Sequence, residues 1–510
     1  MTGRTMIKSA GIVTVLLFLS RLFGFAREAA IAACYGTSWL TDTYFAAASI
    51  PSILFLAFND AIKTAFIPVY GDYHDKEEGN SLALAVFLGL GGILLLASIL
   101  LVIFAPLVMR LVVPGYSGVQ YELSVTMARI MLPGLLFLGL AGLCSGVLNI
   151  KKNFVIPSLT AFPNNLVIIA TVLLLGKRFG IMALVWATAA GFALQFLIQV
   201  PAVARHGIFT ARKAAWRHPA IKRMAVLLVP VLIGSATVEL KTLTDKIFGS
   251  FLAEQSISYL NYAAKIYSLP GGILVLALLT VIYPTMVELY YRREMKEFKE
   301  TVCQGTGLMI LLMFPIMVGM MVLSTPIVRL IYERAAFDAQ ATHNTAYALI
   351  FYSLGLLPSG VMLLFNRAFY STKDTKTPMY FSFFTTLLNV VLNWLLMKPL
   401  AYGGLALGTS LSLYFGAIGM AVALHRRIGP YGVSQILDTL WKAGVASLFM
   451  GAAVRFALPY LEGGGFLLQA ARLGIVIMMG ALVYFVLAYI LKIRELELAL
   501  SLLWRRISRG

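Results

Sequence analysis

The chain has 510 residues, of which 60% are hydrophobic and only 12% are charged, and its mean hydropathy is +0.86. Soluble proteins carry about 25% charged residues. The composition therefore excludes a water-soluble enzyme, a disordered chain and a fibrous repeat, and it predicts an all-α polytopic membrane protein. A net charge of +19 would suggest nucleic acid in a soluble protein. In a membrane protein, basic residues in the loops set the orientation in the bilayer. This explains the positive charge, and we expect no nucleic-acid partner.

Fourteen segments are long and apolar enough to cross a bilayer core of about 30 Å as helices. Strands of a membrane barrel would alternate in polarity, and the run from Gly89 to Leu101 does not. The predicted spans are 9–33, 41–70, 81–107, 121–149, 155–176, 180–203, 224–253, 257–290, 301–327, 343–371, 377–397, 402–424, 439–460 and 467–491.

Basic residues in the connections predict the orientation. With the N-terminus in the cytoplasm, 24 Lys and Arg residues lie in cytoplasmic segments and 6 lie on the opposite side. Cytoplasmic loops carry the excess of Lys and Arg, so both termini are predicted to be cytoplasmic. We expect the basic stretch 205–223 to lie on the inner leaflet and to link two halves.

The chain contains two similar six-span halves. Pro157 and the pair Phe179-Gly180 in the first half correspond to Pro378 and Tyr402-Gly403 in the second. An even number of spans inserts both copies in the same orientation, with a substrate site between them. The alternative is that short Pro and Gly coincidences occur in any apolar chain. The predicted organisation is an N-lobe at 1–204, a linker at 205–223, a C-lobe at 224–425, and two extra spans with a tail at 426–510.

Three cations lie several residues inside apolar stretches. Arg21 and Arg27 are about 9 Å apart along a helix, and Lys265 precedes Pro270, where a helix can kink and free its carbonyls. A central Arg or Lys costs at least about 2.5 kcal/mol on insertion scales, so such residues usually face a wet cavity or a partner. We expect cations from both halves to form one positive, water-filled cavity.

The chemistry of this cavity suits an anionic headgroup, and we expect phosphate or pyrophosphate because Arg forks match phosphate oxygens. The alternative is structural packing through salt bridges, and the two readings are compatible. The candidate acidic partners are Glu28, Asp42, Asp60, Glu239 and Asp245.

No catalytic constellation is present in the sequence. It has no Walker loop, no Gly-x-Ser-x-Gly and no metal-binding cluster. Its cysteines, Cys34, Cys144 and Cys303, lie far apart and predict neither a disulfide framework nor a thiolate site. We therefore expect a transporter without a resident cofactor rather than an enzyme.

Three long runs carry a family resemblance. They begin SRLFGFAREAAIAACYG at residue 20, TDKIFGSFLAEQSISYLNYAAK at residue 244 and FNRAFYSTKDTKTPM at residue 365. Together they resemble the MurJ (MviN) lipid II flippases of the MOP superfamily over spans one to twelve. The resemblance implies a multi-pass protein of the bacterial cytoplasmic membrane that moves the undecaprenyl-pyrophosphate-linked peptidoglycan precursor to the outer leaflet by alternating access. It also implies a role in cell-wall synthesis, contact with the cell-wall synthesis machinery and a monomeric state.

The resemblance also assigns residues. Arg21 and Arg27 match the family's span-one arginines, and Asp42 matches its acid at the start of span two. Lys265 takes the place of a span-eight arginine and loses the bidentate fork. Lys63 stands in for an arginine that the family often carries earlier in span two. With Glu28 and Asp60, Asp42 forms a set of structural or gating acids.

Two further features follow from the resemblance. Some family members hold sodium in the second lobe, and the matching positions here are Asp245, Asn389, Asn393 and Thr409. Oxygen ligands suit a hard cation, whereas the alternative is interhelical hydrogen bonding by Asn. Spans thirteen and fourteen form, in the family, a groove for the long lipid tail; otherwise these spans only pad the fold.

Other functions remain open from the sequence. One is export of another undecaprenyl-pyrophosphate-linked polysaccharide unit. A second is cation-coupled drug export within the same superfamily, which would favour an acidic, aromatic cavity. A third is a non-transporting scaffold for the wall machinery.

Overall fold

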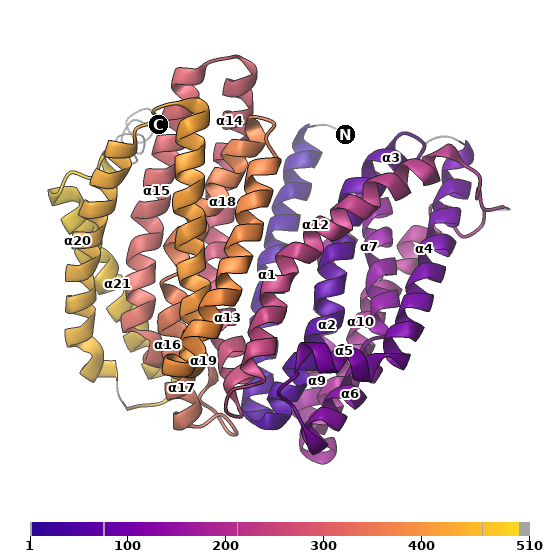
Figure 1. Ribbon diagram of the computed structural model, residues 1–510, viewed down its shortest axis with the longest axis horizontal. Helices are drawn as coiled ribbons and strands as arrows, with labels where there is room; N and C mark the ends of the chain where they lie inside the picture. The colour runs from indigo at the N-terminus through magenta and orange to yellow at the C-terminus, as the bar shows by residue number, and fades with distance from the viewer. Residues whose placement is uncertain (1–2, 75–76, 212, 462, 499–510) are drawn as a thin grey trace. The chain divides into compact units, whose positions relative to one another are not determined.

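A computed structural model of the chain describes residues 3–74, 77–211, 213–461 and 463–498 (Figure 1). Every regular element within these ranges is a helix, which confirms the all-α prediction. Helices are expected because backbone groups in a bilayer must be satisfied within their own segment. The chain divides into two compact units: unit 1 is Met1–Ser258 with Arg334–Phe337, and unit 2 is Tyr259–Glu333 with Asp338–Gly510.

Unit 1 contains long apolar helices joined by short turns. The π-helical segment η1 follows α2 directly, within predicted span two. Its elements are α1 (Gly3–Tyr35), α2 (Trp39–Ala61), η1 (Ile62–Phe66), α3 (Ile67–Gly71), α4 (Glu77–Ile103), α5 (Ala105–Val112), α6 (Gly118–Met131), α7 (Gly134–Ile150), α8 (Val155–Leu159), α9 (Ala161–Phe179), α10 (Ile181–Leu197), α11 (Val200–Ala204) and α12 (Pro219–Gly249).

Unit 2 is also built of long apolar helices. Its π-helical segment η2 begins at the Gly-Gly pair where the sequence predicts a kink. Its elements are α13 (Ser256–Pro270), η2 (Gly271–Val275), α14 (Leu276–Tyr291), α15 (Met295–Val322), α16 (Ser324–Tyr332), α17 (Ala339–Ser353), α18 (Leu356–Ser371), α19 (Lys376–Ile428), α20 (Val433–Ala457), the 3₁₀ turn η3 (Leu458–Leu461) and α21 (Phe466–Ile490). The first three residues of α13 belong to unit 1.

Each predicted span falls mainly on helical residues. Within the described ranges, ten helices are long and apolar enough to cross a membrane, or eleven if the bent pair α17–α18 counts as one span. The count of fourteen crossings therefore stays a prediction. Spans eleven and twelve both lie in α19, which is broken at Ala401 (φ 47°, ψ −131°). Pro399 explains the break, because proline removes a helical hydrogen bond and clashes with the preceding turn.

The connections after predicted spans four and ten fold alike. Lys152 and Lys373 both adopt the left-handed conformation, with φ of 60° and 59°. The next residues, Asn153 and Asp374, each donate a backbone N–H to the carbonyl five residues earlier. A side-chain oxygen of each residue also accepts a hydrogen bond from the backbone N–H three residues later. The distance is 3.5 Å at Asn153 and 3.0 Å at Asp374. A proline follows at the same spacing in both, which supports the predicted repeat.

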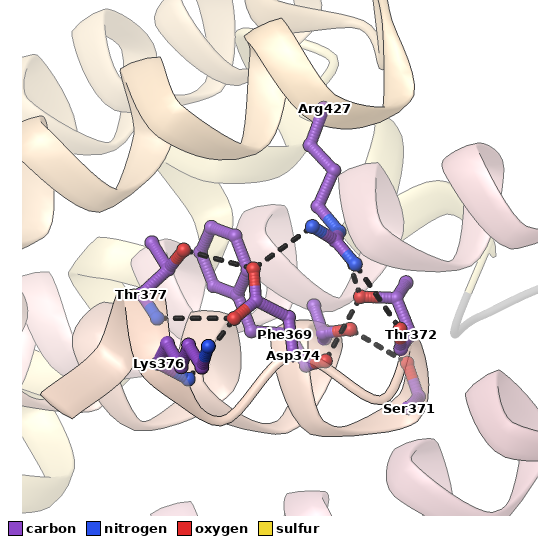
Figure 2. A network of polar contacts seen from close by, with 8 residues as sticks. Phe369, Ser371, Thr372, Asp374, Lys376, Thr377 and Arg427 are labelled. Carbon is purple, nitrogen blue, oxygen red and sulfur yellow. Dashed lines mark hydrogen bonds and ion pairs between the residues drawn. The ribbon is translucent and has the colours of Figure 1, made fainter.

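The second of these connections is fastened by Arg427, at the end of α19 (Figure 2). Its Nη1 pairs with Asp374 over 2.9 Å, and its Nε donates to the hydroxyl of Thr372 over 3.1 Å. Burial alone would raise the pKa of Asp374. Hydrogen bonds from Thr377, the charge of Arg427 and the N–H of Lys376 outweigh burial and hold this pKa below its ordinary value.

The first helix of the predicted C-lobe packs within unit 1 in the structure. Helix α12 begins at Pro219, whereas the expected span began at 224, and it packs against α2 within unit 1. The described residues between Arg205 and His218 form turns rather than a regular helix. Pro219 explains the early start, because proline is preorganised for the first helical position. The lobe boundary derived from the repeat stays a prediction about sequence similarity.

Candidate functional site

Arg27 lies on α1 and is held from two sides. Its Nη2 pairs with the Glu28 carboxylate over 2.7 Å, and its Nη1 donates to the side-chain carbonyl of Asn165 on α9 over 3.2 Å. Glu28 and Asn165 are buried. Within the described part of unit 1, Nε of Arg27 is buried without a hydrogen-bond partner. The expected pairing of a span-one arginine with Glu28 is therefore present in the structure.

Gly24 lies where α1 faces α9, and the space beside it would accept a small side chain. A Cβ there would lie 3.8 Å from the side-chain nitrogen of Asn165, an ordinary contact distance. Asn164, the preceding residue on α9, is also buried, and its side-chain oxygen has no hydrogen-bond partner among the described residues. The Arg27 site is thus a buried polar cluster in which Nε of Arg27 and the side-chain oxygen of Asn164 have no hydrogen-bond partner among the described residues.

Arg21 and Lys265 are the other predicted cavity cations, and both are exposed. Arg21 lies six residues before Arg27 on α1 of unit 1. Lys265 lies on α13 of unit 2, five residues before the end of that helix at η2. The convergence of the three cations on one cavity stays a prediction, because each unit is described by itself.

Asp42, one of the candidate acidic partners of the cations, is held by a residue far along the chain. Its Oδ1 accepts the backbone N–H of Ser258 over 2.7 Å and the Ser258 hydroxyl over 2.5 Å. Asp42 is 3% exposed. Next to this contact, the hydroxyl of Thr37 donates to the side-chain oxygen of Gln255 over 3.1 Å. The start of α2 is thereby fastened to the segment after α12, a pairing of residues more than 200 positions apart.

The structure does not describe the side chains of the predicted site residues Asp60 and Lys63. The side chain of Glu239, one of the candidate acids, is also outside the described part. The backbone of Lys63 lies in the π-helical segment η1. Such segments occur often at functional sites, but the contacts of this lysine remain a prediction.

The second predicted cluster comes together within α19. The side-chain nitrogen of Asn389 donates to the Thr409 hydroxyl over 3.1 Å and to the Asn393 side-chain oxygen over 3.4 Å. All three residues are buried, and the Asn389 side-chain oxygen has no hydrogen-bond partner among the described residues. Asp245, the fourth predicted ligand, lies on α12 in unit 1. The three neutral side chains offer oxygen donors of the kind sodium takes; no cluster of three His, Cys, Asp or Glu is found in the described ranges.

A groove runs along α15, α20 and α21, which lie beside one another in unit 2 (Figure 1). Its volume is about 310 Å³, and apolar side chains such as Leu312, Met320, Val454 and Ile477 line it. These helices contain predicted spans nine, thirteen and fourteen. The groove agrees with the furrow that the family resemblance implies for spans thirteen and fourteen, and it adds α15 to its walls.

Sequence reasoning missed one residue pair at this groove. The hydroxyl of Tyr484 on α21 donates to the backbone carbonyl of Leu311 on α15 over 2.8 Å. Pro315 lies four residues after Leu311 and has no N–H, so this carbonyl lacks its helical partner. The proline was a visible signal that a carbonyl in span nine needs another donor, but the identity of the donor was not readable.

Comparisons with known proteins agree with this architecture. The family described as "Lipid II flippase MurJ" matches residues 31–492. A Burkholderia cenocepacia protein named "Lipid II flippase MurJ" is 27% identical over 429 residues, covering 81% of this chain and 83% of its own length. A Rickettsia prowazekii protein named "Probable lipid II flippase MurJ" is 28% identical over 501 residues, covering 96% and 98%.

Solved structures of membrane transporters are also similar to this chain. The structure titled "Lipid II flippase MurJ, inward closed conformation" superposes with a TM-score of 0.81 at 26% identity, covering 94% of this chain and 98% of that one. An inward-facing MATE-family multidrug transporter of the MOP superfamily gives 0.68 at 14% identity, covering 83% and 98%, and shows a shared fold alone. The match over residues 31–492 spans most of the chain, which therefore belongs to the MurJ family of lipid II flippases.

Proposed function

We propose that this chain moves lipid II, the undecaprenyl-pyrophosphate-linked peptidoglycan precursor, from the inner to the outer leaflet of the bacterial cell membrane for cell-wall synthesis. The observation that carries the proposal is the family match over residues 31–492, supported by relatives named as lipid II flippases and by the full-length structural match. Cytoplasmic termini, a monomeric state and contact with the wall-synthesis machinery are further expectations of this proposal.

In the proposed mechanism, the pyrophosphate binds to cations of α1 and α13. Glu28 and Asn165 each hold one terminal nitrogen of Arg27 and so orient its guanidinium before substrate arrives. The buried Nε is a remaining donor for a phosphate oxygen. Charge-assisted bonds from Arg to phosphate are stronger than neutral ones. Arg21 and Lys265, both exposed, would supply further positive charge.

Asp42 suits a gating role in alternating access. Its carboxylate takes two hydrogen bonds from Ser258, and it is buried. A buried acid that loses its donors is strongly disfavoured. The contact therefore stabilises one state, and opening would require new partners or water at Asp42.

The groove of α15, α20 and α21 suits the isoprenoid tail. A long hydrocarbon chain cannot enter an aqueous cavity cheaply, so headgroup and tail need separate paths. The groove is apolar, and at about 310 Å³ it would hold a section of the tail rather than its whole length.

A sodium site in unit 2 is a second part of the proposal. In the structure the Asn389 side-chain nitrogen faces the oxygens of Asn393 and Thr409, so an ion would bind with this amide turned to bring its unpartnered oxygen toward them, and the three oxygens would then suit a hard cation. Sodium should then raise the unfolding temperature of the purified protein more than potassium does, and Asn389→Ala should abolish the difference. Equal effects of the two ions would leave interhelical hydrogen bonding as the role of these residues.

Complementation of flippase-depleted bacteria tests the main proposal. Wild-type protein and Arg27→Lys should restore growth at least in part, while Arg27→Ala, inserted at equal level, should not. Leaflet-specific labelling of the accumulated lipid then identifies the cargo. Accumulation of a different lipid-linked glycan would favour a sister exporter, and full growth with both Arg21 and Arg27 replaced by alanine would refute the cationic site.

A further inference from the structure

A short segment between α16 and α17 is part of unit 1. Residues Arg334–Phe337, which we call the strap, belong to that unit, whereas their neighbours on both sides, Glu333 and Asp338, belong to unit 2. The backbone reaches at most about 3.6 Å per residue. Any shift of α16 and α17 relative to unit 1 therefore stretches the strap or detaches it.

The strap caps the C-terminal end of α1. The last carbonyls of a helix have no donor within the helix. Gly36, which follows α1, donates its N–H to the Ala32 carbonyl over 2.8 Å, and the Ala33 carbonyl accepts the N–H of Ala336 over 3.0 Å. A residue more than 300 positions away thus holds the end of the helix that carries Arg27.

Gly36 makes this close approach possible. Its φ is 59°, in the left-handed region that favours glycine. A Cβ at Gly36 would collide with the carbonyl oxygen of Ala336 and would lie 2.9 Å from the carbonyl carbon. The obstacle is backbone and not a flexible side chain, so any larger residue at position 36 has to displace the strap.

The docked strap is held in a strained shape by few contacts. Ala335 has a φ of 49°, which a residue with a Cβ adopts at a cost. Next to it, the N–H of Phe337 donates to the Arg334 carbonyl over 3.0 Å, and the Phe337 ring is 1% exposed. Strain of this kind persists only where the surroundings hold it. One hydrogen bond to α1 and one buried ring make a contact that can be broken and formed again.

We propose that the strap is a latch on the end of α1 that releases and docks again in each transport cycle. In the predicted orientation, this end of α1 lies at the outer face of the membrane. The inference rests on the proposed function, because alternating access requires the outer side to open. While the latch is docked, α16 and α17 are tied to α1; once it is released, they no longer follow that helix.

Hydrogen exchange of the full-length protein in nanodiscs, read by mass spectrometry, tests the docking. Gly36→Ala should speed exchange of the strap amides about two- to tenfold, the equivalent of one lost hydrogen bond. Gly118→Ala is the matched control, because Gly118 has a φ of 52° and open space around its Cβ position. It introduces similar backbone strain without a collision. Unchanged exchange in Gly36→Ala, or an equal increase in both variants, would overturn the docking role of Gly36.

A removable cross-link tests whether release is required. Ala33→Cys and Ala336→Cys would be combined with Cys34→Ser and joined in flippase-depleted cells by a short bis-methanethiosulfonate linker, which reduction removes. The linked protein should stop delivering lipid II to the outer leaflet, reduction should restore delivery, and each single cysteine variant should be unaffected by the linker. The readout is labelling of lipid II at the cell surface.

The outcomes separate the latch from the proposed function. Delivery by the linked protein at the wild-type rate, or no cross-link between the two positions, refutes the latch alone. Absence of lipid II delivery by the wild-type protein itself refutes the proposed function, and the exchange experiment then still decides whether the strap docks on α1.

Discussion

Removing the hydroxyl of Tyr484 tests whether Pro315 creates the need for the contact between α21 and α15. Tyr484 is 1% exposed, and its hydroxyl donates to the Leu311 carbonyl over 2.8 Å. Pro315 has no N–H to offer that carbonyl. Tyr484→Phe therefore leaves a buried acceptor without a donor, while the ring and its packing stay in place.

The environment of the Leu311 carbonyl determines how much free energy of unfolding Tyr484→Phe should remove. An unsatisfied buried polar group costs about 1–3 kcal/mol, whereas interhelical hydrogen bonds in a membrane protein average about 0.6 and reach about 1.7 kcal/mol. Because the acceptor lacks its helical partner, we expect a loss of about 1.5 kcal/mol in the free energy of unfolding. With Pro315→Ala, residue 315 donates to Leu311, and the same Tyr484→Phe change should cost about 0.5 kcal/mol or less.

A double-mutant cycle measures this coupling. The wild type, Tyr484→Phe, Pro315→Ala and the double variant would be unfolded by SDS in mixed micelles, as full-length proteins. Tyr489→Phe is the matched control, because Tyr489 lies on the same helix and is 62% exposed. The expected coupling is about 1 kcal/mol. Equal losses in both backgrounds, or none in either, would refute the role given to the proline-freed carbonyl.

Three further outcomes are expected. A Cβ at Gly307 would collide with the buried carboxylate of Glu495, so Gly307→Ala should lower the free energy of unfolding by about 1–3 kcal/mol. Gly319→Ala on the same helix meets an ordinary 3.9 Å contact and should be neutral in the same SDS titration; similar losses at both sites would contradict this. The pKa of Asp374 lies below its ordinary value of 3.8, so its stabilisation is present above pH 3.8 and is lost as pH falls through the lowered value. Asp374→Asn should flatten the pH dependence of stability in that acidic window, and an unchanged profile would count against the network of Figure 2. Asp42→Ala should abolish complementation while Asp42→Asn, which keeps one acceptor, retains part of it; identical growth of both variants would argue against the contact with Ser258.

Some site features were predictable because they depend on neighbours along one helix. Arg27 and Glu28 are adjacent in the sequence, so the ion pair lies within reach of the long arginine side chain without any remote segment. Asn389 and Asn393 are four residues apart, so helical geometry places them on one face, as predicted. Other contacts were not predictable, because their partners are remote in the chain. Asp42 lies 216 positions from Ser258, and nothing near it in the sequence names that donor.

Hydropathy and charge along the chain were sufficient to predict the helical class, the approximate positions of the apolar segments and the break near Pro399. These features depend on local backbone chemistry. The tertiary structure alone decided which helices border a groove and which donor meets the carbonyl freed by Pro315. Those outcomes depend on side chains brought together from distant segments, and an apolar helix offers many equivalent faces in its sequence. Only packing selects the face that meets a particular neighbour.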